Sequence, residues 1–123
     1  VKSGTNIGLY PIVDNAAWVE QLLSLGVKTI QLRIKSKPHS EIINEIKKSV
    51  LIAKEYQGCL FINDYWQYAI EYGAYGIHLG QEDLSFANLE KISQSGLRLG
   101  ISTHSEMEVE RALSVKPSYI AFG

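Results

Sequence analysis

One stretch of the sequence distinguishes an open sheet from a barrel as the fold of this chain: Val27-Lys28-Thr29-Ile30-Gln31-Leu32-Arg33-Ile34-Lys35. Its apolar and polar side chains alternate, and alternate side chains of a strand point to opposite faces. A central strand of an open sheet with helices on both faces is apolar throughout. A strand with one apolar and one polar face instead fits a barrel, whose helices cover the outside and whose site lies where the strands end. The polar face carries Gln31, Arg33 and Lys35.

The rest of the chain repeats a strand followed by a helix, which indicates an α/β fold with a parallel sheet. Strands are predicted at residues 7–14, 27–34, 59–64, 75–80, 98–102 and 119–123. Helices are predicted between residues 14 and 26, 38 and 56, 64 and 73, 85 and 93, and 105 and 115. The repeat averages about 22 residues, so eight repeats need roughly 180 residues. We therefore expect residues 1–123 to form a single unit, the N-terminal part of a TIM (β/α)₈ barrel that lacks the last two strands.

Composition narrows the classes of partner. The chain has 12 basic and 13 acidic side chains, a net charge of −1, which provides no basic field for nucleic acid. The sequence shows no apolar run long enough to cross a membrane and no signal-peptide pattern. Cys59 is the single cysteine, so an internal disulfide is excluded and a reducing, cytoplasmic location is expected. We expect small-molecule partners, with neither nucleic acid nor membrane among them.

The three polar residues of the second predicted strand are the first candidates for a site. Arg33 and Lys35 project in parallel into one cavity, where a planar fork and a mobile point charge suit a phosphorylated substrate. The alternative is an edge strand whose polar face meets solvent.

Acidic residues follow the next two predicted strands. Asn63 and Asp64 end the third strand, and Asp83 lies in the loop beyond the fourth. Carboxylates at a barrel mouth can hold a divalent cation that bridges substrate phosphates. The alternative is that each aspartate caps the helix that follows it.

Three further residues point toward the same mouth. Ser102, at the end of the fifth strand, could bond a heterocycle or cap the next helix. His78 is expected to be a hydrogen-bonded lumen residue rather than a base, and Tyr10 could stack on a planar ligand. No Cys or His base is spaced to make Ser102 a nucleophile, so hydrolysis by a triad is disfavoured.

These residues carry a family resemblance. The relevant segments are Gly8-Leu9-Tyr10-Pro11-Ile12-Val13-Asp14, Gln31-Leu32-Arg33-Ile34-Lys35, Ile62-Asn63-Asp64, His78-Leu79-Gly80-Gln81-Glu82-Asp83 and Ser102-Thr103-His104. In order, they resemble the motifs of thiamine phosphate synthase, also called thiamine-phosphate pyrophosphorylase. The resemblance implies a (β/α)₈ barrel transferase of thiamine biosynthesis. It would couple hydroxymethylpyrimidine diphosphate to thiazole phosphate and release diphosphate, with Mg²⁺ as cofactor.

The resemblance also implies a role for each candidate. Asp64 and Asp83 would hold Mg²⁺. The residues counted as catalytic are Arg33, Lys35, Asn63 and Ser102; the first three would contact the diphosphate. Gln31 and Ser102 would bind the pyrimidine, which completes the expected substrate-binding set.

The sequence departs from the family pattern after its sixth predicted strand. The family has a Pro-Thr-x-Thr-Lys loop there and glycine-rich phosphate turns later, whereas this sequence ends at Gly123. We therefore expect the N-terminal portion of a longer synthase, inactive by itself. Two other interpretations are a thiazole tautomerase-like barrel protein and a noncatalytic half-barrel that assembles through its open edges, for example as a homo-oligomer.

Overall fold

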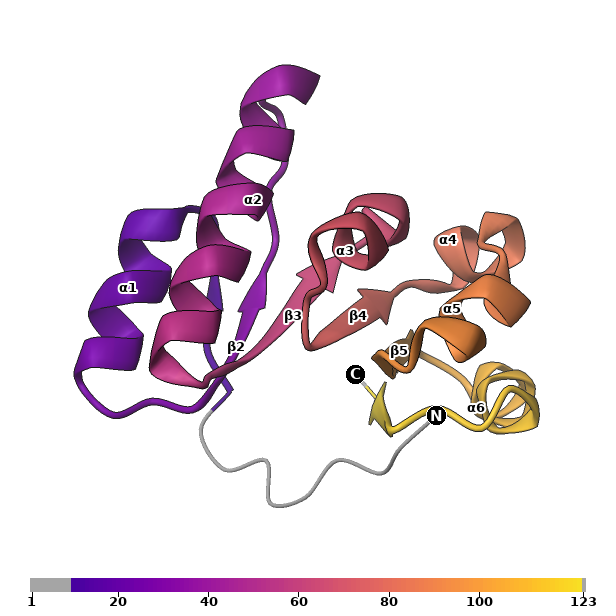
Figure 1. Ribbon diagram of the computed structural model, residues 1–123. Coiled ribbons are helices and arrows are strands. Elements are labelled where there is room, and N and C mark those ends of the chain that lie inside the picture. Colours follow the sequence, from indigo (N-terminus) through magenta and orange to yellow (C-terminus); the bar gives the residue numbers. More distant parts are fainter. Residues whose placement is uncertain (1–9, 123) are drawn as a thin grey trace.

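The computed structural model describes residues 10–122, apart from the side chains of Ser85 and Phe86. Strands and helices alternate along this part of the chain (Figure 1). The strands are β1 (Ile12–Val13), β2 (Thr29–Leu32), β3 (Cys59–Asn63), β4 (Gly76–Leu79), β5 (Arg98–Thr103) and β6 (Tyr119–Phe122). The helices are α1 (Ala16–Ser24), α2 (His39–Tyr56), α3 (Trp66–Tyr72), α4 (Gln81–Phe86), α5 (Leu89–Ser95) and α6 (Glu106–Ser114).

The strands form one parallel sheet in chain order, β1-β2-β3-β4-β5-β6. This order confirms the predicted succession of strand–helix units. β2 lies between β1 and β3, with Gln31 beside Ile12 on one side and Phe61 on the other. The alternative of an exposed edge strand is therefore wrong for β2. Its polar residues lie on the concave, lumen face of the sheet.

The sheet curls strongly, as a barrel requires. Tyr10, just before β1, and Tyr119, on β6, bond through their hydroxyls, and their ring centroids are 5.7 Å apart. In a flat sheet the first and sixth strands would be separated by about 24 Å, because neighbouring strands lie about 4.8 Å apart. Contact between the outermost strands thus requires curvature. The fold is an incomplete α/β TIM-like barrel, as predicted.

The apolar face of the sheet packs against the helices, which cover its outer side (Figure 1). Ile30 and Leu32 of β2 are each 1% exposed, and equivalent residues of the next strands join the same core. Val50 of α2 and Ile92 of α5 close this core from the helix side. The alternation seen in the sequence therefore corresponds to a helix-covered face and a lumen face.

The structure differs from the prediction in the length of the first strand, since β1 is only Ile12–Val13, and in the region of the fourth predicted helix. The single helix expected at residues 85–93 is wrong, since α4 and α5 are separate helices. Ala87 is extended, and the Asn88 side chain accepts from the Lys91 backbone N–H to begin α5. Asp83 consequently lies in the first turn of α4, not in a loop. Parts of the first and last predicted strands, residues 7–9 and 123, lie outside the described residues.

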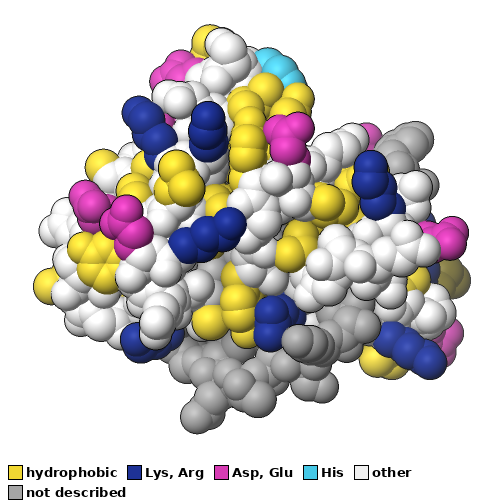
Figure 2. All heavy atoms as spheres, viewed as in Figure 1, with side chains coloured by type: hydrophobic (Ala, Val, Ile, Leu, Met, Phe, Trp, Pro, Cys, Tyr) yellow, Lys and Arg dark blue, Asp and Glu magenta, His cyan; other side chains and the backbone are white. Residues whose placement is uncertain are grey.

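The surface carries mixed charge. Figure 2 shows Lys and Arg side chains scattered among acidic and apolar ones on one face, without a continuous basic area. Within residues 10–122, no helix is both long and apolar enough to cross a membrane.

Candidate active site

A pocket of about 530 Å³ opens at the carboxyl ends of the strands. It is lined by all seven side chains that the sequence singled out as site residues: Gln31, Arg33, Lys35, Asn63, Asp64, Asp83 and Ser102. All six strands or their ends and one helix, α4, supply the wider lining, so the pocket forms only once the sheet has curled. This is the end of the sheet at which barrels of this type place their sites.

The two cations of the pocket differ in their surroundings. The Lys35 ammonium lies 2.6 Å from a carboxylate oxygen of Asp64. Arg33 is exposed and forms no ion pair with any residue of the described chain. The Arg33 backbone is nevertheless fixed, because its N–H donates to Val13 O at 2.8 Å. A guanidinium free to form paired hydrogen bonds is well suited to an incoming phosphate.

The two aspartates form an acidic pair. Burial, followed by a hydrogen bond with Asp64 and the charge of Asp64, raises the pKa of Asp83 to about 6. The negative charge of one carboxylate makes it unfavourable for the other to ionise as well. A bound divalent cation would offset this repulsion. Across the described residues, no group of three His, Cys, Asp or Glu side chains could hold a metal. The chemistry of two adjacent carboxylates is compatible with Mg²⁺, because this ion commonly takes one or two carboxylates and completes its shell with water and phosphate oxygens.

Neither aspartate caps a helix through its side chain. α3 begins after Tyr65 without a side-chain cap, and α4 begins after Gly80 in the same way. Asp64 adopts a left-handed backbone with φ of 72°, which is uncommon for a residue other than glycine. Its N–H donates to His78 O at 3.0 Å, which ties the end of β3 to β4. The capping alternative is therefore wrong for both aspartates.

His78 lies in the lumen with both ring nitrogens hydrogen-bonded, as predicted. Nδ1 is 2.6 Å from the Tyr119 hydroxyl, and Nε2 is 2.6 Å from Ser102 Oγ. Burial lowers the pKa of His78 to about 4, although the nearby Asp64 charge acts in the opposite direction. Ser102 does not cap α6, because Ser105 does so by accepting from the Glu108 N–H. Asn63 is 7% exposed and is paired with His78 in the sheet register.

Two residues near this cluster were missed by the sequence analysis. Tyr119 contacts His78 and Tyr10, and Gln81 donates to Ser102 O at 2.9 Å from the start of α4. The signal for Tyr119 was weak: Gly100, its neighbour on β5, leaves room for a large ring. Tyr10 makes edge contacts with Phe61 and Tyr119. Stacking of Tyr10 on a ligand stays a prediction.

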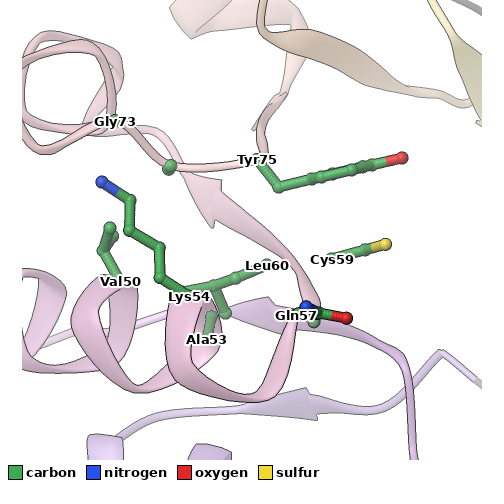
Figure 3. Close-up of a pocket in the computed structure, with 10 residues that line it drawn as sticks. Val50, Ala53, Lys54, Gln57, Cys59, Leu60, Gly73 and Tyr75 are labelled. Carbon is green, nitrogen blue, oxygen red and sulfur yellow. The ribbon is translucent and has the colours of Figure 1, made fainter.

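A second pocket, of about 310 Å³, lies between α2 and the starts of β3 and β4. Figure 3 shows Cys59 and Tyr75 at this pocket, with Lys54 extending toward Gly73. Cys59 is half-buried. None of the seven predicted site residues lines this pocket.

The curled parallel sheet, with a charged pocket at its carboxyl end, defines an α/β protein of the TIM-barrel type. The model of the thiamine monophosphate synthase family matches residues 9–123. The chain therefore belongs to this family.

Individual relatives agree with this assignment. The thiamine-phosphate synthase of Photorhabdus laumondii is 56% identical over 117 residues, which are 95% of this chain and 54% of the relative. The thiamine-phosphate synthase of Klebsiella pneumoniae is 54% identical over 117 residues, which are 95% of this chain and 56% of the relative. The chain thus spans about half the length of the curated relatives it matches.

Solved structures share the architecture. Thiamine phosphate pyrophosphorylase from Pyrococcus furiosus superposes with a TM-score of 0.80 at 28% identity, over 95% of this chain and 60% of that one. A truncated 3-deoxy-D-arabino-heptulosonate 7-phosphate synthase from Thermotoga maritima, at 15% identity and a TM-score of 0.62, shares the fold alone.

Proposed function

We propose that these residues are the N-terminal portion of a thiamine phosphate synthase, a transferase of thiamine biosynthesis. The whole enzyme would join hydroxymethylpyrimidine diphosphate to thiazole phosphate and release diphosphate. The observation that carries this proposal is the convergence, in one pocket, of two cations, two carboxylates and a polar lumen cluster. The single cysteine, Cys59, supports a cytoplasmic location.

The diphosphate would bind at the outer part of the pocket. Arg33, Lys35 and Asn63 would contact its oxygens, and Asp64 and Asp83 would hold Mg²⁺ against it. When bound, Mg²⁺ supplies Lewis-acid stabilisation of the leaving diphosphate. Arg33 and Lys35 add preorganised positive charge where negative charge develops.

The pyrimidine would bind deeper, against Gln31 and Ser102. As the bond between the methylene carbon and the diphosphate oxygen breaks, its electron pair leaves with the diphosphate. The thiazole nitrogen then uses its lone pair to form the new bond to the methylene carbon. The protein supplies positioning and charge, which agrees with the lack of a serine nucleophile in the motifs.

Calorimetric titration with the pyrimidine diphosphate, with and without Mg²⁺, tests this proposal. We expect binding that weakens at least tenfold when Mg²⁺ is removed. Binding of a thiazole phosphate without binding of the pyrimidine diphosphate would contradict the synthase and favour a tautomerase-like protein. A discrete oligomer that responds to neither ligand would favour the noncatalytic assembly.

A further inference from the structure

A chain of hydrogen bonds crosses the floor of the pocket. The Gln31 amide nitrogen lies 3.4 Å from the Tyr10 hydroxyl, which bonds the Tyr119 hydroxyl. Tyr119 and Ser102 then occupy the two ring nitrogens of His78, each at 2.6 Å. We call these five residues the lumen relay: Gln31, Tyr10, Tyr119, His78 and Ser102. The relay begins and ends at the two residues assigned above to the pyrimidine.

We infer one direction of donation along the relay, starting from Gln31. An amide nitrogen carries only donors, so Gln31 Nε2 donates to Tyr10. In the inferred direction, Tyr10 donates its one proton to the Tyr119 oxygen, and Tyr119 donates in turn to His78 Nδ1, across the two contacts that join these atoms. Neutral imidazole has one N–H and one lone pair, so a ring that accepts at Nδ1 donates at Nε2. His78 is 5% exposed, and burial favours this neutral ring.

The direction determines what the pocket offers to a ligand. In the inferred direction, Ser102 Oγ accepts from His78 Nε2–H across their 2.6 Å contact, which leaves the Ser102 proton available to the pocket. At the other end, Gln31 donates one of its two N–H groups to Tyr10, and its carbonyl oxygen can accept. The Ser102 hydroxyl as donor and the Gln31 carbonyl as acceptor complement a heterocycle edge with a lone-pair nitrogen beside an amino group.

We propose that Tyr119 and His78 are positioning residues that orient the Ser102 hydroxyl as a donor, so that the site selects an amino-heterocycle over its oxo analogue. This inference rests on the proposed function for the identity of the ring. The oxo analogue carries a ring N–H and a carbonyl in place of the lone pair and the amino group, so the oriented Ser102 proton and the Gln31 carbonyl oxygen would face groups of the wrong kind.

The fold is shaped around this relay. A Cβ at Gly100 would lie 2.0 Å from the Tyr119 ring, so the ring fits only because β5 carries glycine there. Gly100 is the neighbour of His78 on one side and of Tyr119 on the other. The Tyr119 ring also meets Phe61 edge-on at 5.3 Å between centroids. Tyr119 is therefore held over β5, in reach of His78.

The first experiment measures the tautomer of His78 directly. In protein labelled with ¹⁵N-histidine at pH 8, the ring ¹⁵N shifts separate the two neutral tautomers, and a His78→Asn variant assigns the signal. We expect the Nε2–H tautomer in the unsubstituted protein and a loss of that preference in Tyr119→Phe. Tyr75→Phe is the matched control, because Tyr75 also packs on Phe61 but lies outside the relay. An Nδ1–H tautomer or a doubly protonated ring in the unsubstituted protein would overturn the inference.

The second experiment compares the aminopyrimidine diphosphate with its 4-oxo analogue by calorimetry. We expect the oxo analogue to bind at least tenfold more weakly, and this ratio to fall below threefold in Tyr119→Phe. Equal binding of both by the unsubstituted protein would overturn the inference and leave the proposed function intact. The Nε2–H tautomer without binding of either compound would support the relay direction and count against the proposed function.

Discussion

At the scale of single residues, the acidic pair gives the most direct test of the metal assignment. We expect Asp83→Asn to weaken Mg²⁺-dependent binding of the pyrimidine diphosphate at least tenfold, because one of two anionic ligands becomes neutral. Glu82→Gln is the matched control, since Glu82 is the adjacent acid in the first turn of α4; its effect should stay below threefold. Calorimetry at saturating and zero Mg²⁺ measures both. Unchanged Mg²⁺ dependence in Asp83→Asn would contradict the assignment.

Arg33 is the second residue with a separable effect. Arg33→Ala should weaken diphosphate binding at least tenfold, because an exposed guanidinium without an ion pair in the described chain is lost from the pocket. Lys48→Ala removes another cation, one that lies 4.0 Å from Glu45 on α2, and should leave binding unchanged. Fluorescence competition with inorganic diphosphate measures both variants. Equal losses in the two would indicate a general charge effect instead.

Some of these residues could be predicted and others could not. The period of two along β2 placed Gln31, Arg33 and Lys35 on one face, and burial of Gln31 at 4% exposure agrees. Tyr119 could not be found in this way, because its contact with His78 depends on strand register and on the space above Gly100. Residue type and spacing indicate a face; they do not indicate which rings meet across a lumen.

At the scale of elements, the fit between β5 and β6 depends on one missing side chain. Gly100→Ala should lower the free energy of unfolding by about 1–3 kcal/mol, because the added methyl group overlaps the Tyr119 ring. Gly80→Ala is the control: a Cβ there meets nothing within 4 Å, and the change should stay within about 0.5 kcal/mol. Urea denaturation followed by circular dichroism measures both.

The contact between Gly100 and Tyr119 can also be tested with a double-mutant cycle. If the overlap is the cause, Tyr119→Ala should remove most of the penalty of Gly100→Ala, and the two effects should not be additive. Full additivity would locate the cost of Gly100→Ala elsewhere in β5.

Strand positions were predictable where short apolar runs mark them. The interiors of β2 to β5 fell within the predicted ranges because each lies in such a run, and the residues of β2 and β4 are buried throughout. The division between α4 and α5 was missed, because α4 begins at Gly80 without a side-chain cap and ends at an extended Ala87. Both ends of α4 are set by the backbone conformation, which the residue types at these positions do not indicate.

At the scale of the whole molecule, the Tyr10–Tyr119 contact joins the two outer strands of the curled sheet. The polar face of β2 was enough to predict a lumen, but not which side chains would meet across it. Burial raises the pKa of both phenols above the usual value of 10.0. The fold therefore needs both in the protonated form.

This requirement predicts how stability changes with alkaline pH. Near pH 10 and above, the unfolded chain releases phenol protons that the folded chain retains, so the unfolded state binds fewer protons and the free energy of unfolding falls as pH rises. The phenols contribute their full stabilisation below pH 10 and lose it as the pH rises toward their raised pKa. Urea denaturation at pH 8, 9.5 and 10.5 should show a steep decline that is shallower in Tyr119→Phe. Tyr56→Phe, which alters a tyrosine that is 38% exposed, should retain the steep decline; the same slope in all three proteins would refute a role for the buried pair in alkaline stability.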